Sequence, residues 1–253
     1  MSISSAFSRH SRRYQRLQSV SWGPVAAISL TVVVVLIVDI LAAVMQFGFF
    51  GIGGGQGSLM PSPAALKENI TALFIFYGSS RLVGLLIIYG FVVYRGNGLR
   101  QLGFRAFRML RALGVMVGSI LGFMAATVVA ITLLQQLAPG VDINAEQSIP
   151  FLEAHGSGEE ILAFLALVVI APLAEETVFR GFLLPGLGKL TGMWPAAVLI
   201  SIGFGLLHPP IASMVVIGVF SLFLCLAYME TDSLWPPITL HAAKNLIAFL
   251  ALI

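Results

Sequence analysis

The sequence predicts an all-α polytopic membrane protein, a transmembrane helical bundle of about seven spans. Two observations support this fold class. Of the 253 residues, 58% are hydrophobic and only 10% are charged, whereas a soluble domain usually carries about 25% charged residues. The apolar residues also form runs of span length, and the polar connectors between them are too short to build a soluble domain. We therefore expect the lipid bilayer to surround most of the chain.

The N-terminal segment 1–23 is polar and basic, and the first expected span follows it at about 24–50. Its arginines are Arg9, Arg12, Arg13 and Arg16. Basic residues beside a span set its orientation and contact anionic headgroups. The positive-inside rule therefore predicts a cytoplasmic N-terminus. Because the basic residues cluster beside spans, the net charge of +3 does not indicate a nucleic-acid partner.

A second span is expected at about 69–94, after a glycine-rich connector. The first two spans carry one charged residue each, Asp39 and Arg81. At a rise of ~1.5 Å per residue, both lie about 20 Å from the cytoplasmic end. Charged residues inside a membrane commonly pair with one another. We therefore expect Asp39 and Arg81 to form a buried, structural ion pair.

The connector after the second span is rich in arginine. In the stretch LRQLGFRAFRMLRAL, a helix would place Arg105, Arg108 and Arg111 on one stripe and apolar residues elsewhere. This pattern is typical of a short helix that lies in the membrane interface. The connector is expected on the same side as the N-terminus, and so is Lys189.

Five further spans are expected, at about 112–137, 160–184, 194–207, 211–229 and 235–253. The polar residues inside spans are concentrated in the last four of them. We therefore divide the chain into the basic cytoplasmic segment 1–23, accessory transmembrane helices and connectors in 24–158, and a core in 159–253 that carries most of the polar residues inside spans.

The fourth span contains two adjacent glutamates and an arginine, in a segment that is otherwise apolar. Ionisable groups at this depth are costly and are functional candidates by default. Glu176 and Arg180 are four residues apart, so they share a face and can pair. Glu175 is rotated by about 100° from that face. Pro172 removes a backbone hydrogen bond and is expected to bend the helix near these residues.

Two later spans carry further polar residues, again spaced four apart. Phe204 and His208 share a face of the fifth span, and His241 and Asn245 share a face of the seventh. A carboxylate base, two imidazoles and an amide are sufficient to activate a water and to stabilise an oxyanion. Each group alone has a structural explanation, a packed histidine or a Glu176–Arg180 clamp. The interpretation depends on Glu175 and these later residues having no pairing partner. Lys244 has no assigned role.

The motifs Glu175-Glu176-Thr-Val-Phe-Arg180, Phe204-Gly-Leu-Leu-His208 and His241-Ala-Ala-Lys-Asn245 resemble the three signatures of the CPBP family. This family includes CAAX prenyl endopeptidases of the Rce1 type and the bacterial Abi proteins of bacteriocin processing and immunity. The resemblance covers about residues 159–250, with the motifs in the family's order on successive apolar segments.

The resemblance implies an α-helical intramembrane endopeptidase with a glutamate-dependent mechanism. Glu175 and His208 would hold and activate the attacking water, and His241 and Asn245 would stabilise the tetrahedral oxyanion. Glu176, Arg180 and Phe204 would support them. No cofactor is then required. A zinc site formed by Glu175, His208 and His241 is the alternative, although the chain has no HExxH helix.

The expected substrate is a membrane-associated peptide or protein, of the CAAX type or a bacteriocin precursor, and a role in self-immunity is left open. Short, basic loops favour a bacterial inner membrane. The sequence is compatible with two other functions. One is a non-proteolytic immunity or scaffold protein that retains the fold. The other is an ion-coupled transporter with Asp39, Arg81 and Glu175 as a relay, although the chain lacks the paired helix breaks of inverted repeats.

Overall fold

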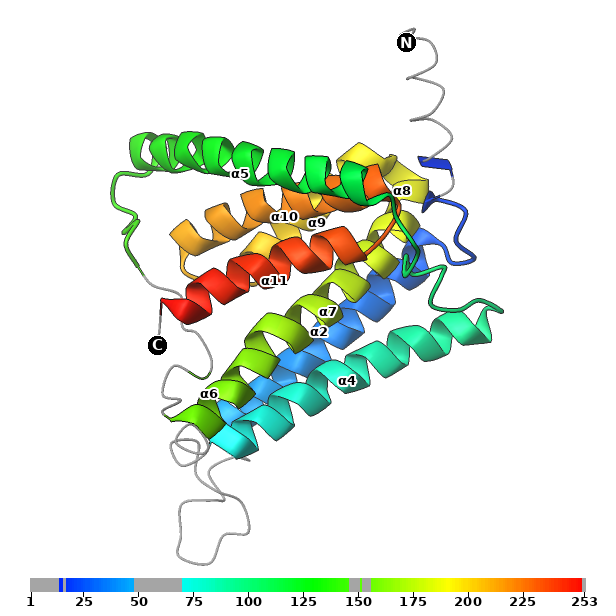
Figure 1. Cartoon of the computed structure of the whole chain (residues 1–253), viewed down its shortest axis with the longest axis horizontal. Helices are drawn as coiled ribbons and strands as arrows, with labels where there is room; N and C mark the ends of the chain where they lie inside the picture. The colour runs from blue at the N-terminus through cyan, green and yellow to red at the C-terminus, as the bar shows by residue number, and fades with distance from the viewer. Residues whose placement is uncertain (1–13, 16, 48–69, 146–150, 152–155, 252–253) are drawn as a thin grey trace, which may run out of the picture.

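The computed structural model describes residues 14–15, 17–47, 70–145, 151 and 156–251, and no β-strand occurs among them. Within the described part of the chain, the helices form a bundle of seven rods (Figure 1). The helices are α2 (Pro24–Phe47), α4 (Ile70–Tyr94), α5 (Met109–Leu137), a composite rod from Ser157 to Thr191, α9 (Met193–Leu206), α10 (Ile211–Thr231) and α11 (Trp235–Leu250). The predicted all-α class is confirmed, and the bounds differ from the expected spans by a few residues at most ends.

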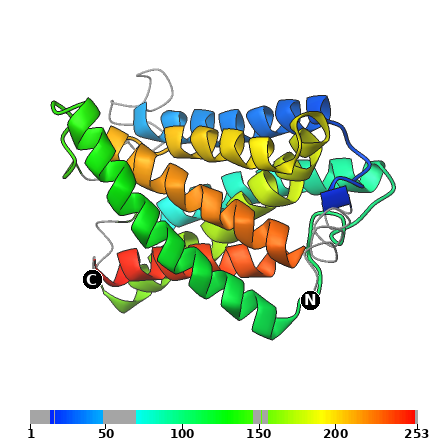
Figure 2. The same cartoon turned by 90° about the horizontal axis from the view of Figure 1, so that it is seen from above.

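Length and composition make four of these helical stretches candidate membrane spans, within the described residues. They are Leu73–Tyr94, Met109–Leu137, Gly158–Thr191 and Ile211–Thr231. Two more apolar stretches, Pro24–Ile37 and Met193–Leu206, are shorter. Helix α5 crosses α10 on the outside of the bundle (Figures 1 and 2) and exposes large apolar residues such as Leu110 and Leu137 along its length. An apolar outer face of this kind suits contact with lipid chains.

The expected interfacial helix is wrong, because residues 95–108 form turns and extended chain. Gly96 and Gly103 have positive φ angles, of 75° and 100°, which break a helix. Contacts with the connection between α10 and α11 hold the extended residues 104–108 and the turn before them in place. The Arg105 guanidinium lies 2.6 Å from an Asp232 carboxylate oxygen, and the Leu234 N–H donates to the Gly103 carbonyl oxygen at 2.8 Å. Tertiary contacts therefore override the helical pattern of the arginines.

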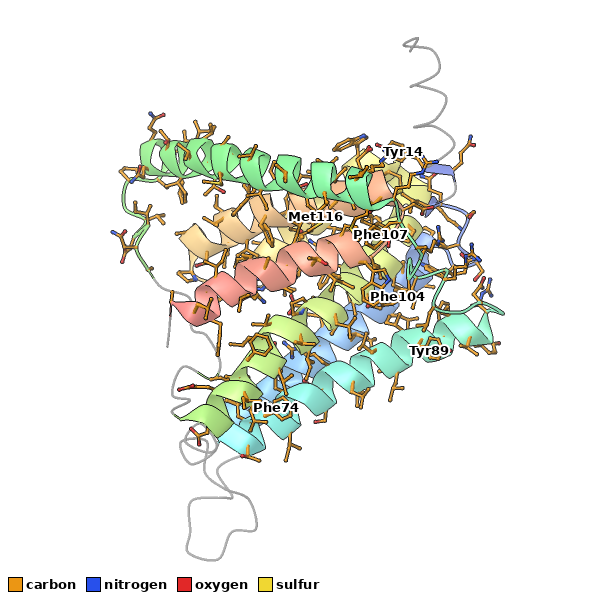
Figure 3. The ribbon with its side chains drawn as sticks, in the orientation of Figure 1. Tyr14, Phe74, Tyr89, Phe104, Phe107 and Met116 are labelled. Carbon is orange, nitrogen blue, oxygen red and sulfur yellow. The ribbon has the colours of Figure 1, made fainter. Side chains whose placement is uncertain are left out.

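Aromatic packing adds to these contacts. Phe104, labelled in Figure 3, lies between α4 and α5. Its ring meets the Trp235 ring edge-to-face at a centroid distance of 5.5 Å. At the same end of the bundle the N-terminal segment packs against the composite rod. Trp22 is fully buried, stacks on Phe182 and donates from its indole N–H to the Phe182 carbonyl oxygen at 2.9 Å. The connector 95–108 and the segment that precedes α2 are thus packed against the helices that carry the polar motifs.

The composite rod runs through the middle of the bundle (Figure 1) and alternates between α- and π-helical turns. Its segments are α6 (Ser157–Phe164), η1 (Leu165–Ile170), α7 (Ala171–Glu176), η2 (Thr177–Leu183) and α8 (Leu184–Thr191). Pro172, at the start of α7, lacks the N–H that a regular helix would use. The π-helical segment η1 directly precedes it, and π turns inside α-helices are frequent at functional sites. The irregularity expected near Pro172 therefore takes the form of a change in helix type.

Helices α9 and α10 approach each other closely at a pair of glycines. A Cβ atom on Gly205 would lie 2.4 Å from the Met214 carbonyl oxygen and 3.0 Å from the Gly218 Cα. Small residues at helix crossings allow this approach in membrane proteins. Because His208 follows the end of α9, the crossing also positions that histidine.

We predict that Gly205→Ala destabilises the protein by about 1–3 kcal/mol, since the new methyl group meets backbone atoms that cannot move aside. Gly203→Ala is the matched control, because a Cβ atom on Gly203 has nothing within 4 Å. Thermal unfolding of both variants in detergent would test this. Equal unfolding midpoints for the two variants would contradict the close packing of α9 and α10.

Candidate active site

An ion pair lies at the centre of the polar cluster. An Arg180 guanidinium nitrogen lies 3.0 Å from Glu176 Oε1, and both side chains are fully buried. Arg180 also donates to the Ser221 hydroxyl at 2.6 Å and covers the face of the Phe204 ring at 4.7 Å. The pairing expected from the four-residue spacing is confirmed, and its partners come from three helical rods.

His241 lies between the two glutamates. Its Nδ1 lies 2.8 Å from Glu176 Oε1, and its Nε2 lies 3.9 Å from Glu175 Oε2. A carboxylate can only accept at this position, so Nδ1 carries a proton and donates it to Glu176. The interpretation that His241 has no pairing partner is therefore wrong. The hydrogen bond fixes the ring so that Nε2 is directed at Glu175.

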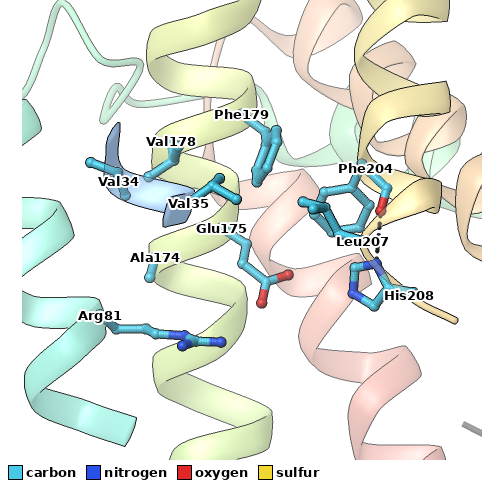
Figure 4. A pocket seen from close by; sticks show the side chains of 10 residues that line it. All are labelled: Val34, Val35, Arg81, Ala174, Glu175, Val178, Phe179, Phe204, Leu207 and His208. Atoms are coloured by element: carbon cyan, nitrogen blue, oxygen red, sulfur yellow. Dashed lines mark hydrogen bonds between the residues drawn. The ribbon is translucent and has the colours of Figure 1, made fainter. Parts of the chain in front are cut away.

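Glu175 has a different environment from its neighbour. Its side chain is 21% exposed, whereas that of Glu176 is fully buried. Glu175 extends into a pocket with about 640 Å³ of empty space, part of it open to the outside (Figure 4). The pocket is lined by residues from the composite rod, from α2 and α4, and from the end of α9: Val34, Val35, Arg81, Ala174, Glu175, Val178, Phe179, Phe204, Leu207 and His208.

His208 faces Glu175 across this pocket (Figure 4). Its Nδ1 lies 2.7 Å from the Phe204 carbonyl oxygen, one helical turn earlier. A carbonyl oxygen accepts, so Nδ1 donates and Nε2 is left as an acceptor in the neutral ring. The Phe204 ring lies 4.9 Å from the His208 ring, centroid to centroid. Phe204 thus supports both His208 and Arg180.

Asn245 connects α11 to the composite rod. Its amide nitrogen donates to the Leu167 carbonyl oxygen, in the π-helical segment η1, at 2.9 Å. An amide nitrogen has two hydrogens, so this bond leaves a second one for another acceptor. Lys244, the preceding residue, is partly buried, and its ammonium nitrogen lies 6.0 Å from the centre of the Phe220 ring.

A scan against protein families matches residues 157–247 to the model of Rce1-like type II CAAX prenyl endopeptidases. We refer to this matched segment, which is similar to the family, as the Rce1-like domain. No curated protein and no solved structure matches the chain. The resemblance carried by the three motifs is thereby confirmed for this segment, which contains Glu175, Glu176, His208, His241 and Asn245. At the level of the family, the match indicates a membrane-embedded endopeptidase of the CAAX type.

The donor groups of the Rce1-like domain do not form a zinc site in this structure. Among the described residues, no three His, Cys, Asp or Glu side chains lie close enough together to hold a metal ion. The alternative set of Glu175, His208 and His241 is therefore not assembled around a common point.

Arg81 was expected to pair with Asp39, whose side chain lies outside the described residues, and that pairing stays a prediction. In the structure, Arg81 lies in the wall of the pocket that contains Glu175. Its guanidinium carbon lies 4.0 Å from the centre of the Tyr77 ring. The sequence indicated that Arg81 lies at membrane depth, but not which helix its span packs against, so this contribution was missed.

We predict that Arg180→Gln destabilises the fold by about 3–5 kcal/mol, because it leaves the Glu176 carboxylate buried without a counter-charge. Arg111→Gln is the control. Arg111 is 42% exposed and pairs with Glu230, and breaking an exposed pair costs at most about 1 kcal/mol. Unfolding of both variants in mixed micelles would measure the difference. A similar loss of unfolding free energy in the two variants would show that the buried pair stabilises the fold no more than the exposed pair does.

Proposed function

We propose that the protein is an intramembrane endopeptidase in which Glu175 and His208 activate the attacking water. The observation that carries the proposal is the contrast between two adjacent carboxylates. Glu176 is fully buried and bonded to Arg180 and His241, while Glu175 is partly exposed in a pocket opposite His208. A general base must be within reach of the water whose proton it takes. Of the two, only Glu175 meets this requirement.

In the proposed reaction a water molecule sits between the Glu175 carboxylate and His208 Nε2. Glu175 takes one of its protons as the oxygen attacks the carbonyl carbon of the scissile peptide bond. A tetrahedral oxyanion forms, and the same proton then passes to the leaving amine nitrogen as the C–N bond breaks. The products are a carboxylic acid and an amine, as hydrolysis requires.

The oxyanion would be stabilised by His241 and Asn245. His241 donates from Nδ1 to Glu176, and a protonated Nε2, which lies 3.9 Å from Glu175 Oε2, would be its second donor. The Asn245 amide has a second hydrogen beyond its bond to Leu167. Donors that are fixed before the reaction stabilise developing charge strongly in a water-poor site. The Glu176–Arg180 pair serves here by holding the His241 ring in place.

We further propose that no metal ion takes part and that the N-terminus is cytoplasmic. The distribution of charge supports this orientation. Arg95 and Arg100 follow α4, and Lys189 is in the last turn of α8, at the end of the bundle from which α2 begins. The acidic residues Asp142, which follows α5, and Glu159, in the first turn of α6, belong to the opposite end, as the places of these elements in Figure 1 show. The proposed location is a bacterial inner membrane, and the proposed substrates are membrane-associated peptides of the CAAX type or bacteriocin precursors.

We predict that Glu175→Gln lowers kcat by about 10²–10⁴-fold, because the amide cannot accept the proton of the water. Glu160→Gln is the control, since Glu160 belongs to the same rod but lies in the first turn of α6. Hydrolysis of a fluorogenic peptide library by purified protein in liposomes would measure both. A chelator is expected to leave wild-type activity unchanged. Equal activity of Glu175→Gln and wild type would refute the proposed base, and chelator inhibition would refute metal independence.

A further inference from the structure

Among the described residues that line the pocket of Glu175 and His208, Arg81 is the one cation. It belongs to α4, which precedes the matched Rce1-like segment 157–247. The family match therefore assigns no role to it. Figure 4 shows its side chain extending past Ala174 into the space beside the Glu175 carboxylate.

Among the described residues, an aromatic ring and a hydroxyl group hold the Arg81 guanidinium. Its carbon lies 4.0 Å from the centre of the Tyr77 ring, a cation–π contact. One of its nitrogens donates to the Ser80 hydroxyl at 3.3 Å. Among the described residues, no acidic side chain forms an ion pair with it. The rest of this wall is apolar, with Val34, Val35 and Ala174. A fixed cation in an apolar wall attracts an anion.

The chemistry of the guanidinium group indicates which anion. Its planar fork of N–H donors matches a carboxylate, which it binds through two parallel charge-assisted hydrogen bonds. A peptide whose scissile carbonyl lies between Glu175 and His208 also reaches the Arg81 wall of the same pocket. An extended chain advances by about 3.3–3.6 Å per residue, so a carboxylate a few residues from the scissile bond fits.

We propose that Arg81 is a specificity-determining residue that binds a carboxylate of the peptide substrate close to the scissile bond. The carboxylate is either the free C-terminus of the peptide or an acidic side chain near it. The inference rests on the proposed function, because it uses Glu175 and His208 to position the scissile bond. It assigns recognition to α4 and chemistry to the Rce1-like domain.

The test compares three peptides with the same cleavable sequence: one with a free C-terminus, one with a C-terminal amide, and an amidated one with a glutamate near the end. Wild type is expected to cleave a carboxylate peptide with a KM at least about tenfold lower than that of the neutral peptide, as charge-assisted hydrogen bonds allow. The preferred carboxylate peptide identifies the source of the charge.

Arg81→Gln is expected to remove this preference by raising KM for the carboxylate peptides. The ratio of the KM for the neutral amide to the KM for a carboxylate peptide is expected to fall to about one, and kcat for all three peptides is measured alongside. Arg95→Gln is the matched control. Arg95 directly follows α4 and donates to the Ser21 carbonyl oxygen, outside the pocket. Full retention of the preference in Arg81→Gln would overturn the proposal.

Two further variants separate recognition from a structural role and from a failure of the proposed function. If Arg81 only pairs with Asp39, Asp39→Asn and Arg81→Gln lower the unfolding midpoint alike and slow the cleavage of all three peptides alike, which would overturn the proposal. Binding of the three labelled peptides is measured separately, by fluorescence anisotropy on Glu175→Gln protein with and without Arg81→Gln. A carboxylate preference that Arg81→Gln removes would support the inference even if wild type cleaved nothing. Equal binding of all three would overturn it.

Discussion

The buried ion pair between Glu176 and Arg180 is the constraint on which the site depends. Two charges removed from water cost several kcal/mol each, and the cost is recovered only when their remaining donors and acceptors are satisfied. Arg180 bonds Ser221 and covers Phe204, and the same Glu176 oxygen accepts from His241. Glu176 Oε2 and Arg180 Nε have no hydrogen-bond partner within the described part of the chain. The partners Phe204, Ser221 and His241 come from α9, α10 and α11. A requirement for local charge balance thus fixes the relative position of four rods, and with it the direction of the His241 ring.

Adjacent residues in a helix point about 100° apart, and this difference separates the two glutamates into distinct roles. Glu176 faces the centre of the bundle and contacts Arg180 and His241, while Glu175 faces the pocket. The π-helical turns on either side of α7 belong to the same arrangement. These π-helical segments flank the two glutamates of α7, and the Leu167 carbonyl oxygen of η1 accepts a hydrogen bond from the Asn245 amide. The irregular rod therefore supplies both the carboxylates and a backbone anchor for α11.

The sequence predicted the helices well because the length of an apolar run directly limits the helix that can bury it. It also predicted the Glu176–Arg180 pair, which depends only on spacing within one helix. It failed where partners come from another segment. Residues 95–108 have a helical pattern but are held extended by Asp232 and Leu234. The contact between His241 and Glu176 was missed for the same reason, because periodicity identifies the face of a helix and not the neighbour that the face meets.

The pocket shows why the accessory helices matter to a site whose motifs all lie in the C-terminal segment. The Rce1-like domain contributes Glu175 and His208, but Val34, Val35 and Arg81 come from α2 and α4. The domain alone would leave the pocket without one of its walls and without its cation. Helix packing closes this wall. Helices α2 and α4 approach so closely that a Cβ atom on Gly84 would lie 2.8 Å from a Val34 methyl carbon. The groups proposed to perform hydrolysis therefore lie in one domain, while the proposed recognition of the peptide depends on a residue outside it.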